Sequence, residues 1–335
     1  MNTVSVILVA VVVTGLGIRL AYLTRAEPRQ RMLHAYSRQV GLALVPAIVP
    51  ELSYRIYSRE RAGIVGSMAG LVVGTAVLVG MVGMTDGRSP WNGLFAGIAM
   101  TVGSTIALIA NDSRSAFAPV PEAPRLARSL SPRLADYVTP LDRTFSLSLL
   151  TLATLGYIAV LAVIAVNPER VFDDVSVRSI LWPAGLLLAL AAAASLLTWT
   201  AANALLGRGQ PARTYIELAW SDAFRSTTLR SLVGIPGIIA AVSTCVLFLS
   251  LSDAINLPAP GSVGEILRGS FTIMGPVLVF ALISWGITSL RNRSTTHYLR
   301  RLWPETAVEL DRRRRACGPA VDDQPGEDSR AKTPA

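Results

Sequence analysis

Ionisable side chains are scarce in this sequence, and the missing types exclude several chemistries. The 335 residues include a single lysine, Lys332, and two histidines, His34 and His297. A P-loop, a retinal or pyridoxal Schiff base and a lysine general base each need a lysine in a pocket, whereas Lys332 lies in a polar tail. The histidines lie in separate charged flanking segments, so they provide no pair of ring nitrogens for haem or zinc.

Cysteine is equally scarce, which excludes a disulfide framework. Cys245 lies in an apolar run and Cys317 lies in the tail, and the two form no CxxC motif. The apolar runs also contain no Asp or Glu, and Arg19 is their only basic residue. The sequence therefore predicts no catalytic residue, no metal site and no cofactor.

Apolar residues, by contrast, are abundant. Hydrophobic residues make up 51% of the sequence and charged residues only 16%, against roughly 25% charged residues in an ordinary soluble domain. The apolar residues form runs of about 20, each long enough to cross about 30 Å of hydrocarbon as a helix. We therefore predict an all-α, polytopic integral membrane protein. Its seven predicted transmembrane helices are Val4–Leu23, Gly63–Met84, Trp91–Ala110, Phe145–Val166, Ile180–Ala201, Ser231–Leu251 and Phe271–Leu290.

The arginines predict the orientation of these spans. They account for most of the net charge of +9 and gather in alternate connecting segments, the arms 24–62, 111–144 and 202–230, and in the region 291–335. Because basic residues are retained on the cytoplasmic side, we predict that the amino terminus faces out and the carboxy terminus faces in. Arginines that alternate with spans favour contact with the anionic headgroups of a plasma membrane and argue against nucleic-acid binding.

Two regions follow from this pattern. The first, 1–290, is a membrane domain of one helix and three hairpins, each hairpin preceded by a basic cytoplasmic arm. The second, 291–335, is cytoplasmic and is predicted to contain a polybasic helix followed by a disordered tail rich in Asp, Pro, Gly and Ser.

Glycines recur at helical spacing on two neighbouring spans. Gly66, Gly70 and Gly74 repeat every fourth residue on the second span, and Gly93 and Gly97 lie on the third. Small residues at this spacing let two helix backbones approach closely. We therefore predict that these glycines form helix-packing faces, either within one molecule or between two.

A proline lies in the first turns of the sixth span. Pro236 stands between Gly234 and Gly237, and a proline in a spanning helix frees a backbone carbonyl and can unwind a segment that binds an ion or substrate. A functional kink and simple helix packing are both compatible with this element.

The arm before the sixth span has an amphipathic appearance. Within Tyr215–Leu232, Trp220 and Phe224 recur at helical spacing beside Arg225 and Arg230. We predict that these four side chains rest on lipid or contact a cytoplasmic partner protein. The polybasic run Arg312, Arg313, Arg314 and Arg315 is expected to lie near anionic lipid in the same way.

Three short segments carry a resemblance to other proteins. YSRQVGLAL, YSRERAGIVGSMAG and ELAWSDAFR resemble segments of multi-pass membrane proteins of unassigned function from high-GC actinobacteria. The resemblance implies a bacterial plasma membrane protein and carries over no catalytic residue.

Three hypotheses for function remain at this point. The first is a non-enzymatic, transport-associated or permease-like membrane subunit. The second is a scaffold or signalling partner that recruits cytoplasmic proteins through its basic arms and tail. The third is an intramembrane enzyme of lipid metabolism. A transporter requires a polar cavity, a scaffold requires only exposed arms, and an enzyme requires convergent titratable residues.

Overall fold

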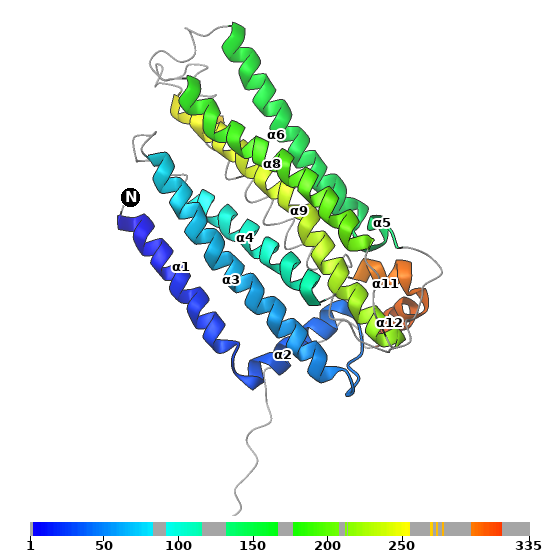
Figure 1. Cartoon of the computed structure of the whole chain (residues 1–335). Helices are drawn as coiled ribbons and strands as arrows, with labels where there is room; N and C mark the ends of the chain where they lie inside the picture. The colour runs from blue at the N-terminus through cyan, green and yellow to red at the C-terminus, as the bar shows by residue number, and fades with distance from the viewer. Residues whose placement is uncertain are drawn as a thin grey trace, which may run out of the picture.

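A computed structural model describes residues 3–82, 92–115, 132–166, 177–207, 212, 214–254, 269–270, 273, 277 and 296–316. Within these ranges the secondary structure is helical, and the part of the chain described contains no strand. Six long helices of this described part form an elongated bundle (Figure 1). They are α1 (Thr3–Tyr22), α3 (Val49–Val82), α4 (Asn92–Ser115), α6 (Pro140–Val166), α8 (Val177–Leu206) and α9 (Tyr215–Ala254).

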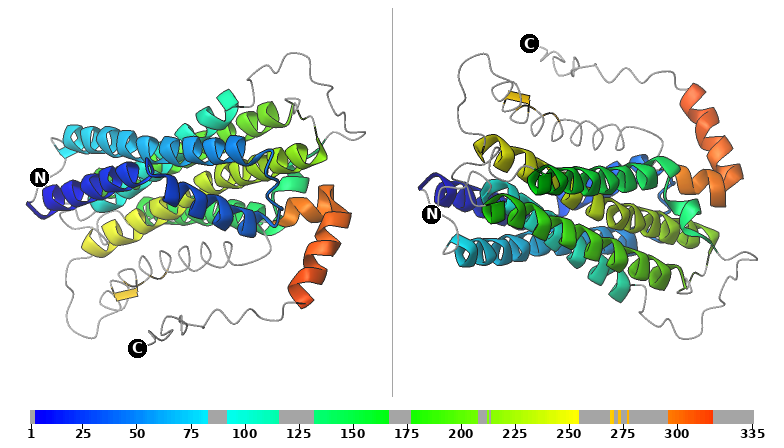
Figure 2. Two further views of the ribbon diagram at one scale, coloured as in Figure 1. Left: turned by 90° about the horizontal axis from the view of Figure 1, so that it is seen from below. Right: turned by 90° about the horizontal axis from the view of Figure 1, so that it is seen from above.

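Four shorter helices lie at one end of the bundle, which we call the arm end. They are α2 (Ala26–Val40), α5 (Leu134–Tyr137), α11 (His297–Leu302) and α12 (Pro304–Ala316). The start of α1 lies at the opposite end, as both views in Figure 2 show. The described parts of the segments predicted to be cytoplasmic therefore gather at the same end of the molecule.

Three of the described helices are able to cross a membrane by length and composition. These stretches are Pro140–Ala162 of α6, Leu181–Leu206 of α8 and Tyr215–Ser252 of α9, while Ala10–Tyr22 of α1 is apolar but shorter. Described helices also cover most of each of the first six predicted spans. The seventh predicted span, Phe271–Leu290, lies outside the described residues apart from isolated positions.

The central helix of the bundle is α9. Its 40 residues correspond to a length of about 60 Å, roughly twice the hydrocarbon thickness of a bilayer. In its most apolar stretch 82% of the residues are buried, whereas in the corresponding stretches of α6 and α8 only 17% are buried. The exposed side chains of α6 and α8 include Leu152, Leu155, Leu196 and Leu197. Outward-facing leucines around a buried central helix suit a protein that is surrounded by lipid.

Two apolar cores lie along α9. The core in the spanning half contains Leu187 of α8, Ile239 and Val246 of α9, and Ala153 of α6. The core at the arm end joins α9 to α2, α5 and α11 through large side chains such as Trp220, Tyr137 and Tyr298. The arm that precedes the sixth span is thus continuous with the spanning helix and has a core of its own.

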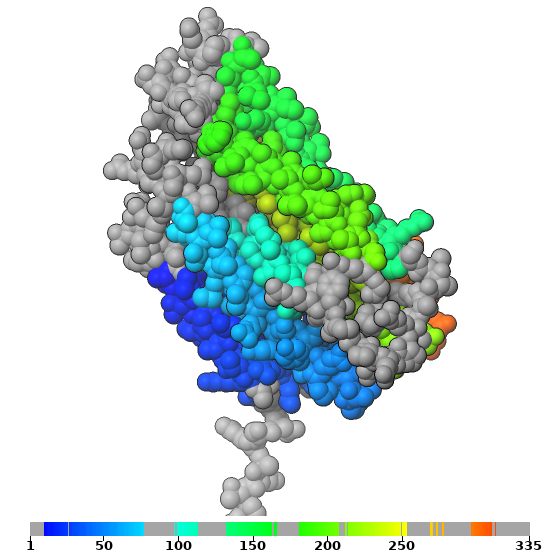
Figure 3. Space-filling view, in the orientation of Figure 1, coloured from blue at the N-terminus to red at the C-terminus, as the bar shows by residue number. Residues whose placement is uncertain are grey.

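The glycines of α3 and α4 allow these two helices to cross at close range. A Cβ atom built on Gly66 would lie 2.5 Å from the Cβ of Ala107, and one built on Gly103 would lie 2.8 Å from the Cα of Gly70. Real Cβ atoms do not approach other atoms this closely, so the crossing requires glycine at these positions. Figure 3 shows α1, α3 and α4 side by side on one face of the molecule.

Candidate functional site

A buried charged cluster joins α3, α4 and α9 at the arm end. The Arg59 side chain is 10% exposed, and its Nη1 lies 3.8 Å from Oδ2 of Asp112. Its Nη2 donates a hydrogen bond of 3.4 Å to the hydroxyl of Thr228, and that hydroxyl donates to Oδ2 of Asp112. Buried charges are tolerated when they are paired and hydrogen-bonded, so the cluster fixes the relative positions of three helices.

Aromatic rings surround the cluster. The guanidinium of Arg55 lies 4.7 Å from the ring centroid of Phe224, and that of Arg59 lies 5.9 Å from it. Tyr36 of α2 stacks on Phe224 with ring centroids 5.4 Å apart, and its hydroxyl lies 3.2 Å from the hydroxyl of Thr227. Such rings stabilise cations that have been removed from water.

Burial changes the proton affinity of two of these groups. Desolvation raises the pKa of the Tyr36 phenol, and the charge of Arg59 partly opposes this effect. Desolvation lowers the pKa of the Arg55 guanidinium, whereas the carboxylates of Asp112 and Glu51 act in the opposite direction. The interior of the arm end is therefore a region where adding a charge is costly unless a partner is present.

A cavity of about 350 Å³ adjoins the cluster, and five helices line it: α1, α2, α3, α4 and α9. We call it the inner cavity. Its wall is mixed, with apolar side chains such as Leu16, Ile64 and Leu108 beside polar ones that include Arg59 and Thr227. A concave site in which polar groups lie beside apolar surface is suited to bind a small molecule or lipid.

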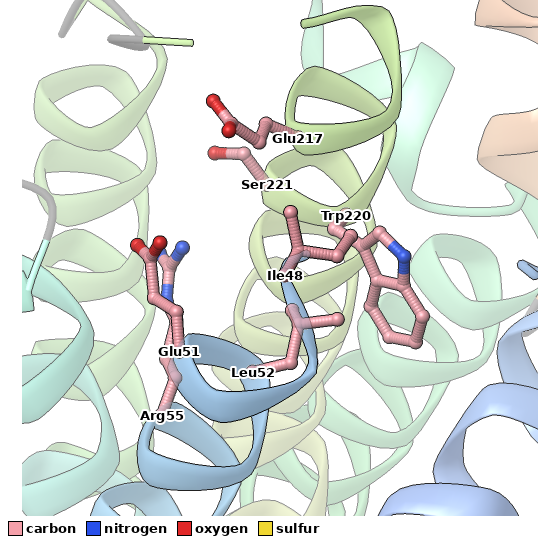
Figure 4. A pocket seen from close by; sticks show the side chains of 7 residues that line it. All are labelled: Ile48, Glu51, Leu52, Arg55, Glu217, Trp220 and Ser221. Atoms are coloured by element: carbon pink, nitrogen blue, oxygen red, sulfur yellow. The ribbon is translucent and has the colours of Figure 1, made fainter. Parts of the chain in front are cut away.

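A second, smaller pocket of about 60 Å³ lies between the start of α3 and the first turns of α9. Figure 4 shows Glu51 and Arg55 on one side of it, with Glu217 and Ser221 projecting from α9 on the other. This volume holds only a few water molecules. Nor do three His, Cys, Asp or Glu side chains gather for a metal ion anywhere in the described part of the chain.

The remaining buried acids at the arm end hold structural elements together. Asp222 is fully buried and accepts hydrogen bonds from the Tyr137 hydroxyl at 2.8 Å and from Nε1 of Trp303 at 2.9 Å. Asp142 accepts a hydrogen bond of 3.1 Å from Nε of Arg230. These contacts fasten α5, α6 and the α11–α12 segment to α9.

The structure corrects the prediction for the arm before the sixth span. Trp220 is 1% exposed, Phe224 2% and Arg225 8%, so these side chains face neither lipid nor a partner protein. The Arg230 side chain is 15% exposed and pairs with Asp142. The physical reason is that α2, α5 and α11 pack against this part of α9. Its buried and partly buried polar side chains, such as Asp222 and Arg230, have partners on neighbouring helices.

The other predicted residues lie in different surroundings. Gly66 and Gly70 lie at the crossing of α3 and α4, but a Cβ on Gly97 would meet nothing within 4 Å, and Gly103 makes the close approach on α4 instead. Gly74 and Gly93 belong to α3 and α4, respectively.

The polybasic run lies at the end of α12. Its first member, Arg312, is exposed and pairs with Glu309 at 3.3 Å. The side chains of Arg313, Arg314 and Arg315 lie outside the described part of the structure.

The residues around Pro236 help α9 to pack between α6 and α8. The helix continues through Pro236. Proline lacks the N–H that would bond to the carbonyl of Leu232, and that carbonyl accepts a hydrogen bond of 3.1 Å from Thr198 of α8. On the other side, the N–H of Gly237 donates to the hydroxyl of Ser146 of α6 at 3.1 Å. Gly234 has open space beside it.

Arg59, Asp112, Asp142 and Asp222 were not among the residues predicted from the sequence. Each contacts a partner on a distant helix, so no local spacing identifies it. The one available signal was the position of Asp112, two residues beyond a predicted span, where an acid must either reach solvent or find a cation. Comparisons with known protein families, curated proteins and solved structures found no match.

Proposed function

We propose that this chain is a non-enzymatic, permease-like or transport-associated subunit of a bacterial plasma membrane. It crosses the membrane seven times, with the amino terminus outside and the arm end in the cytoplasm. Basic segments at one end of the bundle, with the start of α1 at the other, support this orientation. The exposed leucines of α6 and α8 support a lipid-facing surface.

The inner cavity is the observation that carries this proposal. A permease-like protein needs a space with polar groups between its helices, and this cavity lies between α1 and the helices α3, α4 and α9. The close crossing of α3 and α4 through Gly66 and Gly103 holds these two helices together, whereas α1 packs less extensively against α3; transport in this proposal uses movement of α1 against the pair.

The contacts of the buried acids argue against the enzyme hypothesis. Asp112 pairs with Arg59, Asp142 pairs with Arg230, and Asp222 accepts from a tyrosine and a tryptophan. Each carboxylate is engaged in joining helices. A catalytic acid or base would instead be aimed at the site where a substrate binds.

Cysteine accessibility tests the permease-like function. In a chain with Cys245→Ala and Cys317→Ala, the variant Ser104→Cys places a thiol on the wall of the inner cavity. An impermeant thiol reagent should modify it from the cytoplasmic side and, in a fraction of molecules, also from outside. The matched control, Thr101→Cys, lies one turn away on an exposed part of α4 and should react from neither side. Reaction of Ser104→Cys from the cytoplasmic side alone would contradict a transport role.

One observation favours the scaffold hypothesis as a second candidate. The helix α12 extends from the arm end (Figure 2) and carries the exposed residues Val308 and Arg312. A variant with all four arginines of the run 312–315 changed to Gln separates the two functions. Loss of a cytoplasmic partner with unchanged labelling of Ser104→Cys from both sides would assign partner contact to α12 alone.

A further inference from the structure

A buried arginine forms part of the wall of the inner cavity. Arg59 lines the cavity and pairs with Asp112, whereas the neighbouring Arg55 lines the smaller pocket together with Glu51 and Glu217. The pair Arg19–Glu60, 3.0 Å apart, lies at the exposed rim and cancels itself.

Arg59 also has unused hydrogen-bonding capacity. A guanidinium has five N–H donors, and Arg59 makes a single hydrogen bond with the described residues, the one to Thr228. Its buried Nη1 has no hydrogen-bond partner among them. A buried donor without a hydrogen-bond partner favours a ligand that brings acceptor oxygens.

The depth of the cavity indicates the kind of anion. Arg19 lies in the last turn of α1, Gly63 begins the second predicted span and Ser231 begins the sixth, and all three line the cavity. In the proposed orientation, these positions correspond to the headgroup layer of the inner leaflet. Basic pockets between helices at this depth are typical binding sites for anionic lipid headgroups.

The apolar part of the wall accounts for the rest of the ligand. Leu16, Ile64 and Leu108 line the cavity together with Arg59. A free anion would use only the polar groups, whereas an amphiphile would place its phosphate beside Arg59 and its first methylenes against the aliphatic side chains.

We propose that the inner cavity binds the phosphate group of an anionic amphiphile, with Arg59 as its main ligand. This inference rests on the proposed orientation and names the class of molecule that the cavity receives. The phosphate is the shared chemistry of a lipid headgroup and of free inorganic phosphate, and the experiment below separates the two sources.

The test measures retained lipid by native mass spectrometry on the purified full-length protein. The probes are phosphatidylglycerol, zwitterionic phosphatidylcholine and inorganic phosphate. We expect one phosphatidylglycerol to be retained in preference to phosphatidylcholine, and millimolar inorganic phosphate should not displace it. Arg59→Gln should weaken retention by about tenfold or more, the effect of losing a charge-assisted hydrogen bond. Arg61→Gln, which alters an exposed arginine on the same helix, should leave retention unchanged.

A second variant keeps the test decisive if Arg59→Gln fails to fold. Leu16→Trp fills the cavity from α1 and leaves all charges in place, and Ile18→Trp is its control on the exposed face of α1. We expect only Leu16→Trp to lose phosphatidylglycerol. Equal retention by both tryptophan variants would overturn the proposal, and displacement by inorganic phosphate would overturn the amphiphile as the ligand. Failure of this test with the predicted sidedness of cysteine labelling intact would leave the orientation standing.

Discussion

Pro236 and Thr198 provide a sharp test of how the central helix is held. Pro236 cannot donate to the carbonyl of Leu232, and Thr198 supplies that donor from α8 at 3.1 Å. Thr198→Val replaces the hydroxyl by a methyl group of similar size and leaves the carbonyl without this partner. Interhelical hydrogen bonds in membranes contribute about 0.6 kcal/mol on average and up to about 1.7 kcal/mol. Because the orphaned carbonyl lies in an apolar environment, we expect a loss near the upper value, about 1.5 kcal/mol.

The same reasoning predicts that Pro236→Ala removes the effect. Alanine restores the N–H at position 236, which can bond to Leu232 within the helix. In that background Thr198→Val should cost less than about 0.5 kcal/mol, so the coupling energy of the double-mutant cycle should be about 1 kcal/mol.

The assay is the free energy of unfolding in mixed micelles with increasing dodecyl sulfate. Thr200→Val is the control, because the exposed Thr200 donates only to Leu197 of its own helix and should change stability by less than about 0.5 kcal/mol in either background. An equal cost of Thr198→Val with Pro or Ala at position 236 would refute the reasoning.

Three further predictions concern the helix crossing, the arm end and its pH dependence. Gly103→Leu should lower stability in detergent by about 2 kcal/mol or more because its side chain meets the backbone of Gly70, whereas Gly97→Leu should be nearly neutral; equal effects would contradict the crossing. Asp222→Ala leaves the buried Tyr137 hydroxyl and the partly buried Trp303 indole without this acceptor and should increase proteolytic release of the α11–α12 segment; unchanged protection would argue against its anchoring role. Burial raises the pKa of Tyr36 above its ordinary value of 10.0. The contribution of Tyr36 to stability is therefore fully present below pH 10 and declines as the pH rises from 10 to the raised pKa. Tyr36→Phe should reduce this decline in a pH series of unfolding free energies, and an unchanged slope would contradict the assignment.

The helices themselves were predictable from the sequence because hydropathy is a local property. Runs of about 20 apolar residues indicate spanning helices without any knowledge of their partners. The spacing of Gly66 and Gly70 likewise indicated a close helix crossing before its partner was known. The partner on α4, Gly103, was not predicted, because the spacing of glycines on one helix does not determine the crossing point on another.

The buried polar contacts were beyond sequence reasoning for a related reason. Tyr137 and Asp222 are 85 residues apart, and their contact depends on how α5 packs against α9. The arm around Trp220 was expected at a surface, since a short segment of apolar and basic residues suits both a lipid-surface helix and a buried one. Its continuity with the spanning helix and the cover provided by α2 and α11 decide between them, and both are tertiary features.

The orientation of the bundle is the central claim, and cysteine labelling of intact cells tests it most directly. In a chain without native cysteines, Asp174→Cys lies in a predicted outer loop, and Arg38→Cys lies on the exposed face of α2 at the arm end. We predict that an impermeant thiol reagent labels the cysteine at position 174 on intact cells and labels the one at position 38 only after permeabilisation. Labelling at position 38, but not at position 174, on intact cells would contradict the account.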